Sequence, residues 1–363
     1  MSKQALQLIT QPLLNAIPDD LTDRLDPVYV EYYNKYNAGR LHTHQIPIET
    51  FRANPLQYVI QWGRADGGEV FRISEQKCPV NGGEISIRIF EPGPADDATT
   101  PRRPLYINYH GGGFTFGDLE MDDPFCRRVC REVGCVAFDV EYRLSPDYRY
   151  PIPLEDCFAA LKWIQKEKVD EFHLDTNRTA IGGVSAGGHL SAVLAHLARD
   201  EGVPLAFQLL VVPGVDMTAL LPNGDVNPTC PYKSFAELVN TPALPVERVC
   251  FAYNHYLGIP RPKGWEKEWK INPIKAPSFR GLAQALVVTA ELDPLREEGQ
   301  AYVEKLREAG VPVEHIMYPR VPHPFMMHDA VLEAGKKYQV DTVRALKDAL
   351  HKKEGDGDKI YRN

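Results

Sequence analysis

The sequence predicts an α/β fold in which helices cover a mostly parallel central sheet. Two observations carry this prediction. From about residue 69 onward, short apolar runs of strand length alternate with amphipathic stretches of helix length, and glycine-rich turns follow two of the runs. Strands that alternate with helices are typical of parallel sheets with both faces buried.

The first two expected strands form a hairpin. Residues 84–90 read EISIRIF, in which Ile85, Ile87 and Ile89 occupy every second position. This period of two is typical of a strand with one buried face. Because Asn81-Gly82-Gly83 precedes this run and favours a turn, we pair residues 84–90 with residues 70–78.

The remaining elements follow in alternating order. Strands are expected at 105–109, 135–140, 179–184, 207–212, 285–290 and 313–318. Helices are expected at 124–133, 154–166, 186–200, 296–309 and from about 329. The helix over 154–166 rests on Leu154, Phe158, Leu161 and Ile164, which recur at helical spacing.

Two segments stand outside this alternation. The first 65 residues carry several tyrosines and prolines at 12, 18, 27, 47 and 55, so short helices and turns are expected, with aromatic side chains that mostly pack. Residues 216–271 are rich in Pro, Asn and aromatic residues and show no clear strand. Because open α/β sheets bind ligands at the carboxyl ends of their strands, we interpret 216–271 as an inserted cap over that edge.

Composition narrows the class of function. Lys plus Arg is 41 and Asp plus Glu is 49, and the resulting net charge of −8 argues against a dedicated nucleic-acid binder. No run approaches the roughly 18 apolar residues of a membrane span. The amino-terminal residues show no signal-peptide pattern, and the seven cysteines include no CxxC pair, so we expect reduced thiols and a cytoplasmic protein.

A candidate nucleophile lies between an expected strand and an expected helix. Gly183-Val184-Ser185-Ala186-Gly187 fits G-x-S-x-G, the pattern of a nucleophile elbow at such a turn. The alternative is a glycine-rich turn that only packs tightly.

A candidate oxyanion hole precedes it. His110-Gly111-Gly112-Gly113 follows the strand at 105–109, and glycines without side chains let backbone N–H groups face a developing negative charge. We expect the N–H groups of Gly112, Gly113 and Ala186 to be the donors, with Ala186 at the start of a helix, where the dipole favours negative charge. The alternative is a flexible glycine loop.

A serine hydroxyl needs a base, and in this architecture an acidic residue and then a histidine follow the serine. Asp293 and His323 each follow an expected strand and so project from the edge that carries Ser185. Glu297 and Glu298 could replace Asp293 but lie on a helix, where we expect them to be solvated. The other histidines near these motifs are expected to be packed or at the surface; they are His110, His189, His196 and His328.

No metal or cofactor is expected. The pair His42 and His44 has no ligand partners at metal spacing, so we assign it to the surface. The cysteines at 126, 130 and 135 are expected to be buried thiols. The chain has no phosphate loop and no dinucleotide fingerprint after a strand.

Several long motifs in one order resemble the hormone-sensitive-lipase-like carboxylesterase branch of the α/β-hydrolase superfamily. They are HGGGFTFGD at 110–118, EYRLSPDYRYPIPLED at 141–156, GVSAGGHLSA at 183–192, NPIKAP at 272–277, ALVVTAELDPLREEGQAYVEKLREAGVPVE at 285–314 and HPF at 323–325. The family usually has Asp where Val184 stands and Gly where Pro324 stands, and neither change removes a reacting atom.

The resemblance implies an α/β-hydrolase fold with a mainly helical cap. The amino-terminal part of the cap would be 1–65 and the inserted part 216–271, around a core made of 66–215 and 272–363. It also implies Ser185, Asp293 and His323 as the catalytic triad.

We therefore expect a serine hydrolase that acts on small to medium, apolar or aryl carboxylic esters through an acyl-enzyme. Some aromatic residues of 216–271 should line the acyl or aryl pocket; the candidates are Phe235, Phe251, Tyr253, Tyr256, Trp265 and Trp269. The partner is a small-molecule ester, and a homodimer is compatible with the sequence. Alternatives are an acyltransferase or lactone-forming enzyme with the same triad, an amidase, and a ligand-binding receptor of the same fold, which would lack the catalytic histidine.

Overall fold

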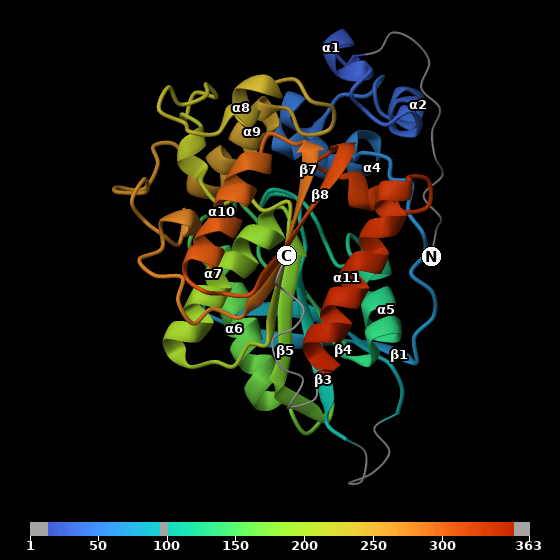
Figure 1. The fold of residues 1–363 in the computed structure, drawn as a ribbon, viewed down its shortest axis with the longest axis vertical. Helices are drawn as coiled ribbons and strands as arrows, with labels where there is room; N and C mark the ends of the chain where they lie inside the picture. Colours follow the sequence, from blue (N-terminus) through green and yellow to red (C-terminus); the bar gives the residue numbers. More distant parts are fainter. Residues whose placement is uncertain (1–13, 95–100, 352–363) are drawn as a thin grey trace.

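A single mixed sheet organises the molecule. The computed structural model describes residues 14–94 and 101–351. The sheet has eight strands in the order β1-β2-β4-β3-β5-β6-β7-β8 (Figure 1). The strands are β1 (Arg72–Val80), β2 (Gly83–Glu91), β3 (Arg103–Tyr109), β4 (Val136–Glu141), β5 (Leu174–Val184), β6 (Phe207–Val211), β7 (Gln284–Leu292) and β8 (Val313–Pro322).

The sheet is mostly parallel, as predicted. β1 pairs with β2, and β2 with β4, in antiparallel register. From β4 through β3, β5, β6 and β7 to β8, every neighbouring pair is parallel. The expected hairpin is confirmed, because Val80 pairs with Gly83 across the turn at Asn81 and Gly82.

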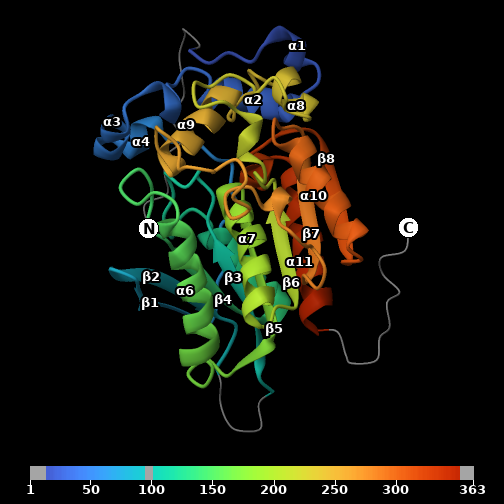
Figure 2. The ribbon, with the colours of Figure 1, turned by 90° about the vertical axis from the view of Figure 1, so that its left-hand side faces the viewer.

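Helices cover both faces of the sheet (Figures 1 and 2). One face packs against α6 (Ile152–Glu167), α7 (Ala186–Glu201) and α10 (Arg296–Glu308). The other face packs against α5 (Asp123–Val129) and α11 (Glu333–His351). Strand side chains alternate between the two faces, so Leu105, Ile107 and Tyr109 belong to the first core and Tyr106 belongs to the second.

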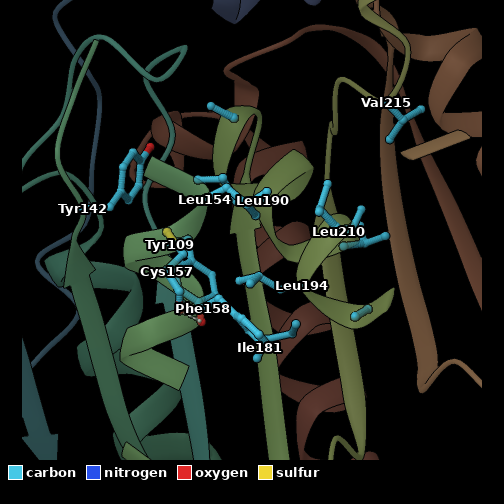
Figure 3. Packing of buried hydrophobic residues seen from close by; sticks show 14 of the residues in the cluster. Tyr109, Tyr142, Leu154, Cys157, Phe158, Ile181, Leu190, Leu194, Leu210 and Val215 are labelled. Atoms are coloured by element: carbon cyan, nitrogen blue, oxygen red, sulfur yellow. Dashed lines mark hydrogen bonds between the residues drawn. The ribbon is translucent and has the colours of Figure 1, made fainter. Parts of the chain in front are cut away.

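Side chains from three strands and α7 pack together in the first core. Figure 3 shows Tyr109, Ile181 and Leu210 from three strands beside Leu190 and Leu194 of α7, all in one buried cluster. Each of these side chains is fully excluded from solvent. The core thereby holds the ends of β3 and β5 in fixed positions next to the start of α7.

Some element boundaries differ from the prediction. α5 ends at Val129, and its last part continues as a π-helical turn, η2 (Cys130–Gly134), where an α-helix over 124–133 was expected. The last helix starts at Glu333, because a short 3₁₀ turn, η5 (Phe325–His328), follows β8 first. β5 starts at Leu174, earlier than the apolar run at 179 indicates.

The two segments outside the alternation form short helices, as expected. The amino-terminal segment contains α1 (Asp19–Thr22), α2 (Pro27–Tyr36), η1 (Thr43–Gln45), α3 (Ile48–Ala53) and α4 (Pro55–Tyr58). The inserted segment contains η3 (Met217–Ala219), α8 (Lys233–Glu237) and α9 (Val246–Leu257), and η4 (Pro273–Lys275) follows it. Both gather at the end of the sheet toward which the arrows of β7 and β8 point (Figures 1 and 2).

Within the ranges that the structure describes, no helix is both long enough and apolar enough to cross a membrane.

Candidate active site

Ser185 lies at a strained turn between β5 and α7. Its backbone has φ 58° and ψ −114°, a region that residues other than glycine rarely occupy. The turn is fixed on both sides, because the Ser185 N–H donates to the Val211 oxygen at 2.8 Å and the His189 N–H donates to the Ser185 oxygen at 2.9 Å. Backbone strain of this kind is concentrated at functional sites, and here it presents the Ser185 side chain to a cavity.

The glycines that flank Ser185 allow the turn to approach β3. A Cβ atom on Gly183 or on Gly187 would overlap the carbonyl oxygen of Tyr109 at the end of β3. The glycines therefore do pack tightly against β3, as the alternative of a glycine-rich turn that only packs predicts. It does not account for the serine between them, whose side chain borders the cavity.

The glycine loop after β3 lies beside this turn. Gly112 has φ 103° and Gly113 has φ 62°, so both adopt backbone conformations that favour glycine. Within the described ranges, the N–H groups of Gly112 and Gly113 donate no hydrogen bond to another protein atom. The N–H of Ala186 opens α7 and has no partner inside that helix.

The loop is held in place from behind. The Phe116 N–H donates to the Gly112 oxygen at 3.0 Å. The His110 Nδ1 hydrogen bonds to the Gly111 oxygen at 2.7 Å, and the ring stacks on Tyr142 with 4.3 Å between ring centroids. These contacts hold the loop beside the turn at Ser185.

Asp293 and His323 meet at the carboxyl ends of β7 and β8. The His323 Nδ1 lies 2.7 Å from the Asp293 Oδ2. The other carboxylate oxygen of Asp293 accepts the Leu295 N–H at 2.9 Å, so the carboxylate is fixed at both oxygens. An ionised carboxylate only accepts hydrogen bonds, so this pair places a ring proton on Nδ1, and in the neutral ring Nε2 is then the acceptor.

The structure brings the six predicted site residues to one place. Ser185, His323, Gly112, Gly113 and Ala186 line a single cavity of about 140 Å³, and Asp293 lies behind His323 with only 1% of its surface exposed. No hydrogen bond joins the Ser185 hydroxyl to the His323 ring within the described residues. Such bonds are often long in enzymes without substrate.

The rest of the cavity lining is mainly apolar and comes from both short-helix segments. From the amino-terminal segment it includes Phe51, Val59, Ile60 and Trp62, and from the inserted segment Ala243, Leu244, Val249, Phe251, Ala252 and Tyr253. Of the aromatic residues expected to line a pocket, Phe251 and Tyr253 do so. The other four do not line it and instead pack in or against the first core; they are Phe235, Tyr256, Trp265 and Trp269.

Three aromatic rings join the two segments to the glycine loop. Phe51 of α3 contacts Phe116 edge to face at 4.6 Å between centroids. Phe116 in turn lies parallel to Phe251 of α9 at 6.0 Å. The helices above the cavity are therefore packed directly on the loop that carries Gly112 and Gly113.

The expectation that Glu297 and Glu298 are solvated was wrong for Glu298. Its side chain is fully buried, and Oε1 accepts the Val215 N–H at 2.8 Å. Burial, and next the negative charge of Asp216, raise the pKa of Glu298 well above its ordinary value. Helical spacing from Leu295 through Glu298 and Tyr302 to Leu306 places Glu298 on the buried face of α10, which is the signal that could have shown this.

The expectation that His42 and His44 lie at the surface was also wrong. The His42 ring is buried against the Tyr33 hydroxyl, with 3.3 Å between Nε2 and the oxygen. Burial, and next the positive charge of Arg248, lower the pKa of His42 to about 3 and that of His44 to about 4. Both rings are therefore neutral near pH 7.

The cysteines at 126, 130 and 135 are buried free thiols, as expected. In residues 14–94 and 101–351, no three His, Cys, Asp or Glu side chains are grouped so that they could hold a metal ion.

Comparison with known proteins gives one consistent result. Residues 106–327 match the family model described as "alpha/beta hydrolase fold". An AB hydrolase superfamily protein of Schizosaccharomyces pombe is 34% identical over 91% of this chain and 95% of its own length. The carboxylesterase NlhH of Mycobacterium tuberculosis is 34% identical over 77% of this chain and 83% of its own.

Solved structures agree with the sequence matches. The structure of EstE1, a thermostable carboxylesterase cloned from a metagenomic library, superposes with a TM-score of 0.71 at 34% identity. That match covers 78% of this chain and 91% of EstE1. The chain belongs to the α/β-hydrolase family, in its hormone-sensitive-lipase-like carboxylesterase branch.

Proposed function

We propose that this protein is a serine-dependent carboxylic-ester hydrolase that works through an acyl-enzyme. One observation carries the proposal: the strained turn at Ser185 borders the same cavity as His323, whose ring is hydrogen-bonded to Asp293. Relatives that are named carboxylesterase and arylesterase support the reaction class.

The proposed mechanism assigns one role to each side chain. The unprotonated Nε2 of His323 accepts the proton of the Ser185 hydroxyl as the serine oxygen attacks the acyl carbon. Asp293 holds the ring tautomer and stabilises the imidazolium that forms. His323 then protonates the leaving alcohol, and a water molecule activated by the same ring releases the acid.

The negative charge that develops on the acyl oxygen needs donors that are already in position. The N–H groups of Gly112 and Gly113 have no protein acceptor in the described ranges, and the N–H of Ala186 begins α7. We assign these three groups to the oxyanion hole. Loss of one such donor costs about 10²- to 10³-fold in rate in enzymes of this kind.

The proposed substrates are small to medium esters. The lining is mainly apolar and aromatic, which favours an apolar acyl or aryl group. We assign the amino-terminal segment up to residue 65 and the inserted segment 216–271 to a cap that closes the cavity above Ser185.

Hydrolysis of p-nitrophenyl acetate by the wild type and by Ser185→Ala tests the proposal. We expect kcat to fall by at least about 10⁴-fold in Ser185→Ala, with unchanged circular dichroism. A Ser185→Ala protein with wild-type activity would contradict the assignment of Ser185. Adding a competing alcohol to the wild-type reaction tests acyl transfer, because a transferase forms a new ester where a hydrolase forms mainly the acid.

A further inference from the structure

One charged side chain lines the otherwise uncharged cavity. Among its described lining residues, Arg248 is the only Arg, Lys, Asp or Glu. Arg248 lies in the first turn of α9, one helical turn before Ala252. The two residues share a face of the helix, and the Cβ of Ala252 would lie 2.7 Å from a Cβ on Gly113. Arg248 therefore borders the cavity from the helix that packs on the glycine loop.

Arg248 has no carboxylate partner among residues 14–94 and 101–351. No Asp or Glu oxygen of the described residues lies within 4.0 Å of its guanidinium, whereas most other arginines in those ranges have such a partner. The adjacent Glu247 is directed away, since its side chain is 78% exposed and lies 3.7 Å from His44. Residues 1–13 contain no Asp or Glu in their sequence.

The protein uses little of the hydrogen-bonding capacity of Arg248. A guanidinium has five N–H donors. In the described ranges only Nη1 has an acceptor, the Ala243 oxygen at 2.7 Å. The side chain is half-buried, and the donors without a protein acceptor are available to a molecule in the cavity.

The titratable groups around Arg248 carry no compensating charge near pH 7. Tyr29 and Tyr33 remain protonated, because burial raises the pKa of both hydroxyls above the ordinary value. His42 and His44 are neutral, because burial and Arg248 lower their pKa values to about 3 and about 4. Burial lowers the pKa of Arg248 itself to about 10, so it stays charged.

A half-buried positive charge without a counter-ion loses part of its hydration, and an incoming anion offsets that loss. We propose that Arg248 binds a carboxylate group of the substrate, so that the preferred esters carry one negative charge at the end remote from the ester bond. This inference rests on the proposed ester hydrolysis and narrows its substrate class.

A carboxylate fits this place better than a phosphate group. The planar fork of a guanidinium matches the two oxygens of a carboxylate. One arginine balances a single negative charge, and the rest of the lining is uncharged, so a dianionic phosphate would retain an unbalanced charge in an apolar cavity.

Matched pairs of methyl esters test the inference. The charged members are monomethyl succinate, glutarate and adipate, and the neutral members are methyl butanoate, pentanoate and hexanoate. Hydrolysis is followed by acid release at constant pH in the wild type and in Arg248→Met, which keeps an unbranched chain of similar length but removes the charge. We expect Arg248→Met to lose about 30- to 1000-fold in kcat/KM for the best charged ester and to keep its activity on the neutral partner.

Two further variants separate recognition from support of the fold. Arg248→Lys keeps the charge without the fork and should retain part of the preference for the charged ester. Arg261→Met is the matched control. Arg261 follows α9, donates a hydrogen bond to Asn254 of that helix and does not line the cavity. An equal loss on charged and neutral esters in Arg248→Met would overturn the inference, since Arg248 would then only hold the Ala243 carbonyl.

A binding measurement separates this inference from the proposed reaction. Titration calorimetry of monomethyl glutarate with Ser185→Ala, alone and combined with Arg248→Met, needs no turnover. We expect the dissociation constant to rise by at least about 30-fold when Arg248→Met is added. Equal affinity of the two proteins would refute the carboxylate site, whereas a wild type inactive on every ester would refute the reaction and leave the binding result valid.

Discussion

At the scale of single residues, the Asp293 carboxylate orients the His323 ring. One oxygen accepts from the His323 Nδ1 at 2.7 Å and the other accepts the Leu295 N–H at 2.9 Å. The carboxylate cannot rotate without losing one of these bonds. The Asp293 side chain therefore determines both the direction of the ring and the nitrogen that carries its proton.

Asp293→Asn should inactivate the protein while it leaves the fold intact. The amide oxygen can still accept the Leu295 N–H, but the NH₂ group then faces Nδ1 and drives the ring proton to Nε2. We expect kcat for p-nitrophenyl acetate to fall by about 10⁴-fold with little change in melting temperature. Asp170→Asn is the control, because Asp170 is 91% exposed and pairs only with Arg102 at the surface. Activity of Asp293→Asn within tenfold of the wild type would contradict the assigned role.

At the scale of elements, α9 and the glycine loop share a tight contact. A Cβ on Gly113 would lie 2.7 Å from the Cβ of Ala252, and Phe251 of the same helix lies parallel to Phe116 of the loop. α9 therefore restricts where the Gly113 N–H can point. It also carries Arg248, so one helix contributes to both ends of the site.

Gly113→Ala should displace this donor, and a second change should restore part of the function. The alanine is strained at φ 62° and overlaps Ala252, so we expect kcat to fall by at least about tenfold. Ala252→Gly removes the overlap and costs about 1 kcal/mol of helix stability. Steady-state kinetics should therefore show the double variant to be more active than Gly113→Ala. A double variant no more active than the single one would show that the overlap is not the cause.

At the scale of the whole molecule, buried neutral histidines make stability depend on acidity. Burial is the main cause that lowers the pKa of each; the values are about 3 for His42 and His328, and about 4 for His44, His189 and His196. In the unfolded chain histidine titrates near pH 6.5, so below that pH the unfolded state binds more protons. The stability that these groups contribute is complete above pH 6.5 and is lost as the pH falls toward 3.

His328→Asn should weaken this dependence. The His328 ring is buried among Tyr29, Tyr32 and Trp62, and its Nδ1 accepts the Gly63 N–H at 3.2 Å. In urea unfolding near pH 5, we expect the slope of unfolding free energy against pH to fall by up to about 1.4 kcal/mol per pH unit, the effect of one proton. The exposed His351 supplies the control variant, His351→Asn. An unchanged slope in His328→Asn would show that His328 takes up no proton on unfolding.

Sequence patterns anticipated the sheet and the residues that meet at the cavity, because both depend on local signals. Period-two runs predict strands, and the glycines near Ser185 and Gly112 follow from backbone contacts that leave no room for a Cβ. The burial of His42 and Glu298 was missed, since polar residues are normally exposed, and the Val215 N–H that Glu298 accepts lies 83 residues away along the chain. Arg248 was missed for the same reason, because its cavity is formed by segments that meet only in the folded protein.

The mass of the protein after reaction with a fluorophosphonate tests the role of Ser185 as nucleophile. The reagent forms a bond to an activated serine oxygen and releases fluoride, so the account predicts one adduct per chain. Peptide mapping should place it on Ser185, and Ser185→Ala should show none. An adduct on another residue, or an unmodified wild type that still hydrolyses esters, would contradict the account.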